Sequence, residues 1–67
     1  MTAGFVKSFS AQKGFGFITP DEGGPDIFVH QSAVLKGGIR TLDVNARVQF
    51  EIAQGARGPQ ATMVVRL

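Results

Sequence analysis

The residues of this chain that could do chemistry are aromatic rings and cations rather than nucleophiles or metal ligands. The 67 residues include six Phe, no Cys and a single His, which is His30. With no thiol, one imidazole and five scattered carboxylates, neither a nucleophile–base pair nor a metal cage can be assembled. The sequence therefore predicts no catalytic residue, no metal site and no cofactor, which leaves stacking and ion pairing as its chemistry.

Three of the six Phe share two short segments, 14–19 and 26–30, with the single His, at alternating positions. Alternate side chains of a strand point to opposite faces. The rings on one face, here named the ring platform, are Phe15, Phe17, Phe28 and His30. The aliphatic residues on the other face are Ile18, Ile27 and Val29. Aliphatic side chains suit the core, so we expect the platform outside; the opposite register would bury Asp26 and His30.

An exposed patch of rings beside cations suits a nucleic acid with unpaired bases. Stacking of one base on an aromatic side chain contributes about 1–3 kcal/mol, and nearby cations follow the phosphates. Lys7 and Lys13 are close to the platform along the chain, and the pI of about 9.7 permits a polyanionic partner, although the net charge of +2 alone would fit any small basic protein. A duplex hides the faces of its bases, so the pattern predicts binding to single strands.

The elements that must position these residues are short strands. Nine Gly and three Pro punctuate the chain, and no segment favours a helix. Alternating or apolar runs predict strands over 4–10, 14–19, 26–30, 46–53 and 61–67. Turn residues predict loops at 21–25 and 54–59, and one turn of 3₁₀ helix at 32–35.

Five such strands predict an all-β fold, a small five-stranded antiparallel barrel. A flat sheet of this size would leave its apolar face wet and its edges unpaired. We expect a core of Val, Ile and Leu, joined by Phe5 or Phe50. The length fits one domain over 1–67. Since the chain shows neither a signal peptide nor an apolar run of about 20 residues, we expect a cytoplasmic protein with no membrane partner and no small-molecule substrate.

Two motifs in the platform segments resemble the ribonucleoprotein-type motifs of the cold-shock domain. They are Lys-Gly-Phe-Gly-Phe-Ile at 13–18 and Ile-Phe-Val-His at 27–30, and similarity at 4–7, 41–43 and 55–61 extends the resemblance over the whole chain. The resemblance implies an OB-fold barrel that binds single-stranded RNA and DNA without catalysis. It also implies an RNA chaperone that melts weak secondary structure, with a role in cold adaptation and in regulating transcription or translation.

Carried over by position, the resemblance assigns base stacking to the ring platform and places Phe9 at its edge. Contacts with phosphates or base edges fall to Lys7, Lys13 and Arg57. Arg57 lies in a predicted turn and would serve equally well as a solvated loop charge.

Three positions of the expected binding face depart from the family pattern. Ser8 stands where the family commonly has Trp, and Gln31 where it often has Phe. In the middle loop an aromatic residue often precedes a Lys-Thr-Leu segment, and here Ile39 precedes the corresponding residues 40–42. Each change removes a potential stack, so we expect a shorter site with weaker and more salt-sensitive binding. A hydrogen bond from Gln31 to a base edge would return part of this loss.

Other functions fit the same barrel less well. The ring patch could bind another protein, or an edge strand could pair between two copies, so a protein-interaction or self-associating barrel is the alternative, as a homodimer rather than a monomer. A dimer that dissociates when an oligonucleotide is added would show that both partners share the patch. Sequence-specific recognition of duplexes lacks a recognition helix, and a nuclease lacks the groups described above.

Overall fold

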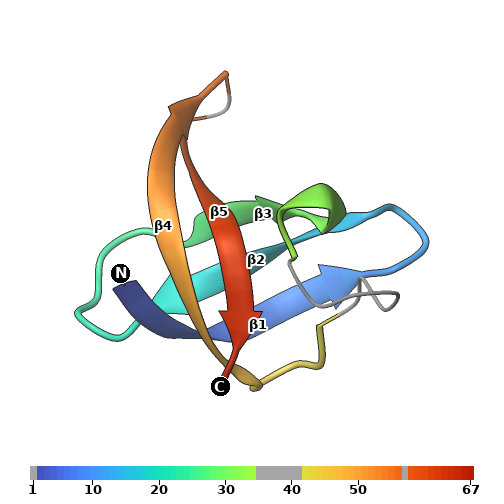
Figure 1. Ribbon diagram of the computed structural model, residues 1–67, viewed down its shortest axis with the longest axis horizontal. Helices are drawn as coiled ribbons and strands as arrows, with labels where there is room; N and C mark the ends of the chain where they lie inside the picture. Colours follow the sequence, from blue (N-terminus) through green and yellow to red (C-terminus); the bar gives the residue numbers. More distant parts are fainter. Residues whose placement is uncertain (1, 35–41, 57) are drawn as a thin grey trace.

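The computed structural model describes residues 2–34, 42–56 and 58–67, which form five strands and one turn of 3₁₀ helix (Figure 1). The strands are β1 Thr2–Ser10, β2 Phe15–Pro20, β3 Ile27–His30, β4 Arg47–Gly55 and β5 Gly58–Arg66, and the 3₁₀ helix η1 spans Gln31–Ala33. The predicted all-β fold is confirmed, and each predicted strand is present with ends that shift by a few residues.

The strands close into a barrel in the order β1-β2-β3-β5-β4, with β4 returning to β1. Four of the pairings are antiparallel, whereas β3 and β5 run parallel where Phe28 meets Gln60 and Val29 meets Ala61. A closed ring with an odd number of strands cannot alternate direction throughout, so one parallel junction is unavoidable. The predicted antiparallel barrel therefore holds everywhere except at this junction.

The barrel interior is filled by aliphatic side chains and one ring. The buried residues are Val6, Ile18, Ile27, Val29, Val34, Leu42, Val48, Phe50, Ala61 and Val64. Phe50 is fully buried, whereas Phe5 is half-buried and lies between Thr19 and Arg47 on the neighbouring strands. The core therefore closes without any ring from β2 or β3.

The hairpin predicted between the fourth and fifth strands is present, but its loop is shorter than the predicted 54–59. β4 continues to Gly55 and β5 begins at Gly58, and the pairs Gln54 with Pro59 and Gly55 with Gly58 extend the ladder to the end of the hairpin. Gly58 has φ of 99°, a conformation that glycine adopts without steric cost, so the turn is tight enough for both strands to stay paired. The resulting hairpin projects beyond the rest of the barrel (Figure 1).

A β-bulge in β1 decides which of its side chains face outward. Val6 pairs with Ile18 and Ser8 pairs with Phe17, so Lys7 is an extra residue between two pairs of the ladder. Val6 is buried, whereas Lys7 and Ser8 are both exposed. The bulge therefore delivers two successive polar residues to the outside, next to Phe17.

Candidate nucleic-acid interface

The ring platform lies on the outer face of β2 and β3, on the side that the alternation predicts. Phe15 pairs with His30, and Phe17 pairs with Phe28. Phe17 is 37% exposed and His30 is exposed, while Phe15 and Phe28 are half-buried. The residues between them, which are Gly16, Ile18, Ile27 and Val29, are all buried. The four rings therefore form a two-by-two array at the surface.

Phe28 holds the array together. Its ring centroid lies 5.6 Å from that of Phe15 with 31° between the planes, and 6.0 Å from that of Phe17 with 76° between the planes. Aromatic pairs attract each other at such separations in tilted and edge-to-face arrangements. The rings are therefore ordered before any ligand arrives, which lowers the side-chain entropy lost when a base stacks on them.

Lys7 is held beside the platform by Asp26. Its Nζ donates a hydrogen bond to Oδ2 of Asp26 over 2.8 Å, and Oγ1 of Thr19 donates to Oδ1 over 3.1 Å. The hydrogen bond from Lys7, followed by that from Thr19, holds the pKa of Asp26 below its ordinary value. The Lys7 side chain remains 63% exposed, and an ammonium group has three donors, so it can bind a phosphate while still paired.

A hollow of about 380 Å³ opens at the Phe17 end of the platform. The residues that line it are Phe17, Pro25, Asp26, Phe28 and Pro59. A flat apolar group with a hydrogen-bond donor at its edge matches this lining. The alternation in 26–30 placed Asp26 on this face, but sequence reasoning missed Pro59, because the parallel pairing of β3 with β5 that brings it here has no local sequence signal.

Lys13 lies in the turn between β1 and β2, at the Phe15 end of the platform. Oγ of Ser10 accepts a hydrogen bond from the backbone N–H of Lys13 over 3.2 Å, and the Ser10 carbonyl accepts from the N–H of Gly14 over 2.7 Å. Ser10 itself pairs with Phe15. The backbone of the exposed Lys13 is thus fixed near one end of the array, and the side chain of Lys7 is held near the other.

Ser8 and Gln31 flank the platform on opposite sides. Ser8 is exposed and pairs with Phe17, so the position where the family commonly has Trp does lie on the outer face. Gln31 is exposed directly after β3 and its side chain lies over Gly14, where an added Cβ would be 3.1 Å from Nε2 of Gln31. Arg57, with Ile39, falls outside the described residues.

Phe9 differs from the four platform rings because it packs against the core. It pairs with the buried Gly16, is itself half-buried and packs against the core cluster. A Cβ on Gly16 would collide with the carbonyl oxygen of Ser8 and lie 2.7 Å from Cα of Phe9. The close approach of β1 therefore requires a glycine at this position.

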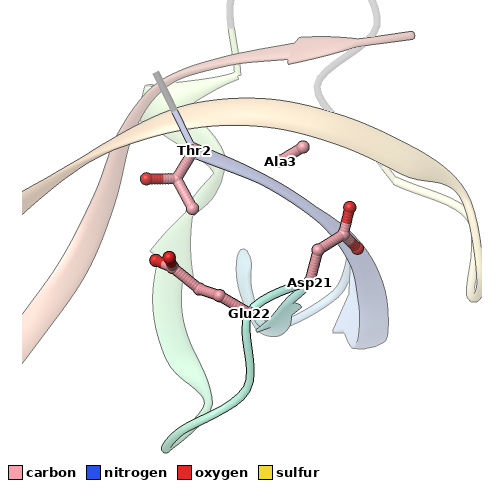
Figure 2. A pocket seen from close by; sticks show the side chains of 4 residues that line it. All are labelled: Thr2, Ala3, Asp21 and Glu22. Atoms are coloured by element: carbon pink, nitrogen blue, oxygen red, sulfur yellow. The ribbon is translucent and has the colours of Figure 1, made fainter.

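A second hollow, of about 180 Å³, shares no residue with the platform (Figure 2). Thr2, Ala3, Asp21 and Glu22 line it, and the Glu22 side chain reaches toward Thr2 while the Asp21 carboxylate points away from Glu22. Arg47 donates to both carboxylate oxygens of Asp21 over 2.6 and 2.7 Å, and this bond holds the pKa of Asp21 below its ordinary value. Two carboxylates repel a phosphate, so this hollow does not suit a nucleic-acid backbone.

Within the part of the chain that the structure describes, no three His, Asp or Glu side chains gather as a metal site would require. Nor does that part contain a helix long and apolar enough to cross a membrane.

Comparison with known proteins agrees with this geometry. Residues 2–67 match the family model of the 'Cold-shock' DNA-binding domain. A cold shock protein of Arthrobacter globiformis is 66% identical over 64 residues, which cover 96% of this chain and 96% of the relative. The cold shock-like protein CspG of Escherichia coli (strain K12) is 56% identical over 64 residues, which cover 96% of this chain and 91% of the relative.

A solved structure shares the fold. The Drosophila structure Unr CSD456 superposes with a TM-score of 0.82 at 27% identity, covering 98% of this chain. The chain spans only 26% of that longer structure. Because a family model matches nearly the whole chain and curated relatives match it over almost their full length, the chain belongs to the cold-shock domain family, whose members bind nucleic acid.

Proposed function

We propose that the chain binds single-stranded RNA and DNA by stacking bases on the ring platform, without catalysis, and acts as an RNA chaperone that melts weak secondary structure. The observation that carries the proposal is the outward pairing of Phe15 with His30 and of Phe17 with Phe28. The core closes without these rings, so filling the core gives no reason for them to be present. Unpaired bases, which have apolar faces, are the ligand that such a surface fits.

The two lysines set the path of the strand. Lys13 lies at the Phe15 end of the platform and Lys7 at the Phe17 end, so phosphates on either side of the stacked bases would each meet a cation. Ser8, Phe9 and Gln31 are proposed as contacts at the border of the platform, and Arg57 as a third cation. Because bases laid on the platform cannot pair with a second strand at the same time, binding shifts the equilibrium of a weak RNA hairpin toward its open form.

The remaining parts of the proposal concern the protein as a whole. We infer a single domain over 1–67 that works in the cytoplasm as a monomer, with no membrane or small-molecule partner. Family membership supports nucleic-acid binding over the alternative of a self-associating barrel. Sedimentation at increasing concentration tests the monomer, and incubation of an oligonucleotide with the protein and Mg²⁺ should leave the oligonucleotide intact.

The test of the stacking mechanism compares single-stranded and double-stranded oligonucleotides of equal length. We expect the wild type to prefer single strands, and Phe15→Ala and Phe28→Ala each to weaken binding by about 5-fold to 150-fold, the equivalent of about 1–3 kcal/mol. Val65→Ala is the matched control, because Val65 is an apolar residue that is 39% exposed on β5, outside the platform. The chain has no Trp and no Tyr, so calorimetry or a labelled oligonucleotide replaces intrinsic fluorescence.

Two results would refute the stacking mechanism. One is equal affinity for single and double strands. The other is unchanged affinity in both Phe variants, with their fold verified by circular dichroism.

A further inference from the structure

His30 differs from the other platform rings because it has a polar edge, and that edge is bound to Ser32. Its Nδ1 accepts a hydrogen bond from the backbone N–H of Ser32 over 3.1 Å and lies 2.9 Å from the Ser32 hydroxyl oxygen. The backbone of His30 is extended, and the side chain caps the first turn of η1. The imidazole is therefore held by two groups of one residue rather than left to rotate in solvent.

The contact with the backbone decides which ring nitrogen carries the proton. A backbone N–H can only donate, whereas a serine hydroxyl can either donate or accept. Nδ1 must therefore offer its lone pair to Ser32, so the neutral ring carries its proton on Nε2. The hydroxyl of Ser32 can then donate to the same Nδ1.

The other edge of the ring is available to a ligand. His30 is exposed, and within residues 2–34, 42–56 and 58–67 both of its hydrogen bonds involve Nδ1. The Nε2–H is thus a donor with a fixed direction at the border of a stacking surface. A Phe ring at this position would offer the same flat face but no donor.

We propose that His30 gives the bound strand a directed hydrogen bond in addition to a stacking face, and that Ser32 is the positioning residue that fixes it. The Nε2–H donates to an acceptor oxygen of the nucleic acid, either on a phosphate or on a base carbonyl. This inference rests on the proposed function of the platform. It assigns His30 two separable contributions and gives Ser32 a role in ligand binding.

His30→Phe separates the two contributions because it keeps a ring and removes the donor. We expect this variant to bind a thymine-rich single strand about tenfold more weakly, the loss typical of one hydrogen bond to a polar or charged acceptor. His30→Asn is the complementary variant, since Asn can still cap η1 through its side-chain oxygen but has neither the ring nor Nε2. It should lose more affinity than His30→Phe.

Modified strands identify the acceptor. Replacing single phosphates by neutral methylphosphonates should weaken binding to the wild type at one linkage and leave the affinity of His30→Phe unchanged there, if the acceptor is a phosphate. If the acceptor is a base carbonyl, the same non-additivity should appear between thymine and adenine strands, since adenine has no carbonyl oxygen. Additive effects in both arms, or full affinity in His30→Phe, would overturn the hydrogen bond.

The role of Ser32 is tested on the ring itself. The ¹⁵N chemical shifts of the imidazole should show a protonated Nε2 and an unprotonated Nδ1 in the wild type at neutral pH. Ser32→Ala keeps the backbone N–H, and therefore the tautomer, but loses the hydroxyl contact and should weaken binding by a few-fold; Ser32→Thr, which keeps a hydroxyl, should restore the affinity. A wild-type ring protonated at Nδ1 would overturn the assignment, and unchanged affinity in Ser32→Ala would overturn the positioning role of the hydroxyl.

Failure of this inference is distinguishable from failure of the proposed function. If Phe15→Ala loses affinity while His30→Phe does not, the platform binds bases and the hydrogen bond is absent. If neither Phe15→Ala nor Phe28→Ala loses affinity, the stacking platform itself is refuted.

Discussion

The two faces of the β2–β3 pair are both apolar, yet one fills the core and the other meets solvent. The inward residues are Gly16, Ile18, Ile27 and Val29, and the outward residues are Phe15, Phe17, Phe28 and His30. Phe has more apolar surface to bury than Val or Ile, so burial alone would favour the opposite arrangement. Side-chain shape therefore matters more than hydrophobicity in deciding which face is inside.

The size of the barrel explains this choice. Five strands enclose a narrow interior, and here one ring, that of Phe50, already shares it with nine aliphatic side chains. Further rings would overfill the space, whereas outside they cost little packing and remain available for a ligand. We therefore propose that the inner face serves stability and the outer face serves binding, and substitutions should separate the two.

The largest expected effect is the loss of stability when a residue of the inner face is truncated. Ile18 is fully buried, so Ile18→Ala should lower the free energy of unfolding by about 2–5 kcal/mol through lost burial and the cavity left behind. Phe17→Ala, one position away on the outer face, should change stability far less and instead weaken oligonucleotide binding. Urea unfolding followed by circular dichroism measures the first effect, and calorimetric titration measures the second.

A small domain has little stability to lose, so a milder inner variant is also needed. Ile18→Val should cost about 0.5–1.5 kcal/mol and leave enough folded protein for a binding measurement. If this variant binds single strands more weakly than its folded fraction explains, or if Phe17→Ala unfolds the barrel, the division between the two faces is refuted.

The next effect concerns Gly16, which lies between two outward rings but faces inward. An added Cβ would meet backbone atoms of β1, namely the Ser8 carbonyl oxygen and Cα of Phe9, and backbone cannot move aside as a side chain can. Gly16→Ala should therefore destabilise the fold by about 3 kcal/mol, the upper end of the usual cost of overpacking. A thermal melt measures it, and a wild-type melting temperature would show that β1 and β2 do not approach each other this closely.

The strands β1, β2 and β3 show what could and could not be predicted from the sequence. The alternation in 14–19 and 26–30 was enough to predict which residues of β2 and β3 face out, because period-2 patterning is local and one face had to be buried. The position of Ser8 next to Phe17 was not predictable from alternation, since it depends on the bulge at Lys7. The family resemblance predicted only that Ser8 lies on the binding face.

Long-range pairing accounts for the other differences. Pro59 joins the hollow beside Phe17 only because β5 runs parallel to β3, a contact between segments about thirty residues apart along the chain. The hydrogen bond of Lys7 to Asp26 likewise spans 19 residues. The hydrogen bond between His30 and Ser32 is local in the sequence. Which ring nitrogen carries the proton, however, follows from the direction of that bond, and residue types alone do not give it.

The third prediction concerns the affinity of the outer face for single strands. Ser8 is exposed opposite Phe17, so Ser8→Trp should add a stacking surface and tighten binding of thymine-rich strands by about 5-fold to 150-fold. The added apolar contact should also make binding less sensitive to salt, since a smaller share of the affinity then comes from phosphate contacts. Titrations at two salt concentrations check both statements.

Val65→Trp provides the control for this change, because Val65 is exposed on β5, pairs with Gln49 of β4 and lies four residues beyond Ala61, where the pairing of β5 with β3 ends. It adds the same indole without extending the platform and should leave affinity unchanged. Equal gains from both Trp variants would mean that the indole acts nonspecifically, and no gain from Ser8→Trp would place the bound strand elsewhere.

The smallest expected effect belongs to the ion pairs outside the barrel. The pKa values of Asp21 and Asp26 are held below the ordinary value of 3.8, chiefly by hydrogen bonds from Arg47 and Lys7 respectively. A carboxyl whose pKa is lowered by folding stabilises the fold above its ordinary pKa, and this contribution is lost as the pH falls through the lowered value. Stability should therefore decline gently from about pH 5 downward.

Asp21→Asn and Asp26→Asn should each flatten part of this decline, and melting temperatures measured from neutral to acid pH will show it. Asp43→Asn is the matched control, because its carboxylate is 82% exposed and 3.6 Å from Arg66, too far for a hydrogen bond. The effect must stay well below that of Ile18→Ala, since solvent screens both pairs. An acid sensitivity that persists in the Asp21→Asn, Asp26→Asn double variant would show that other carboxylates, rather than these two outer pairs, carry the pH dependence.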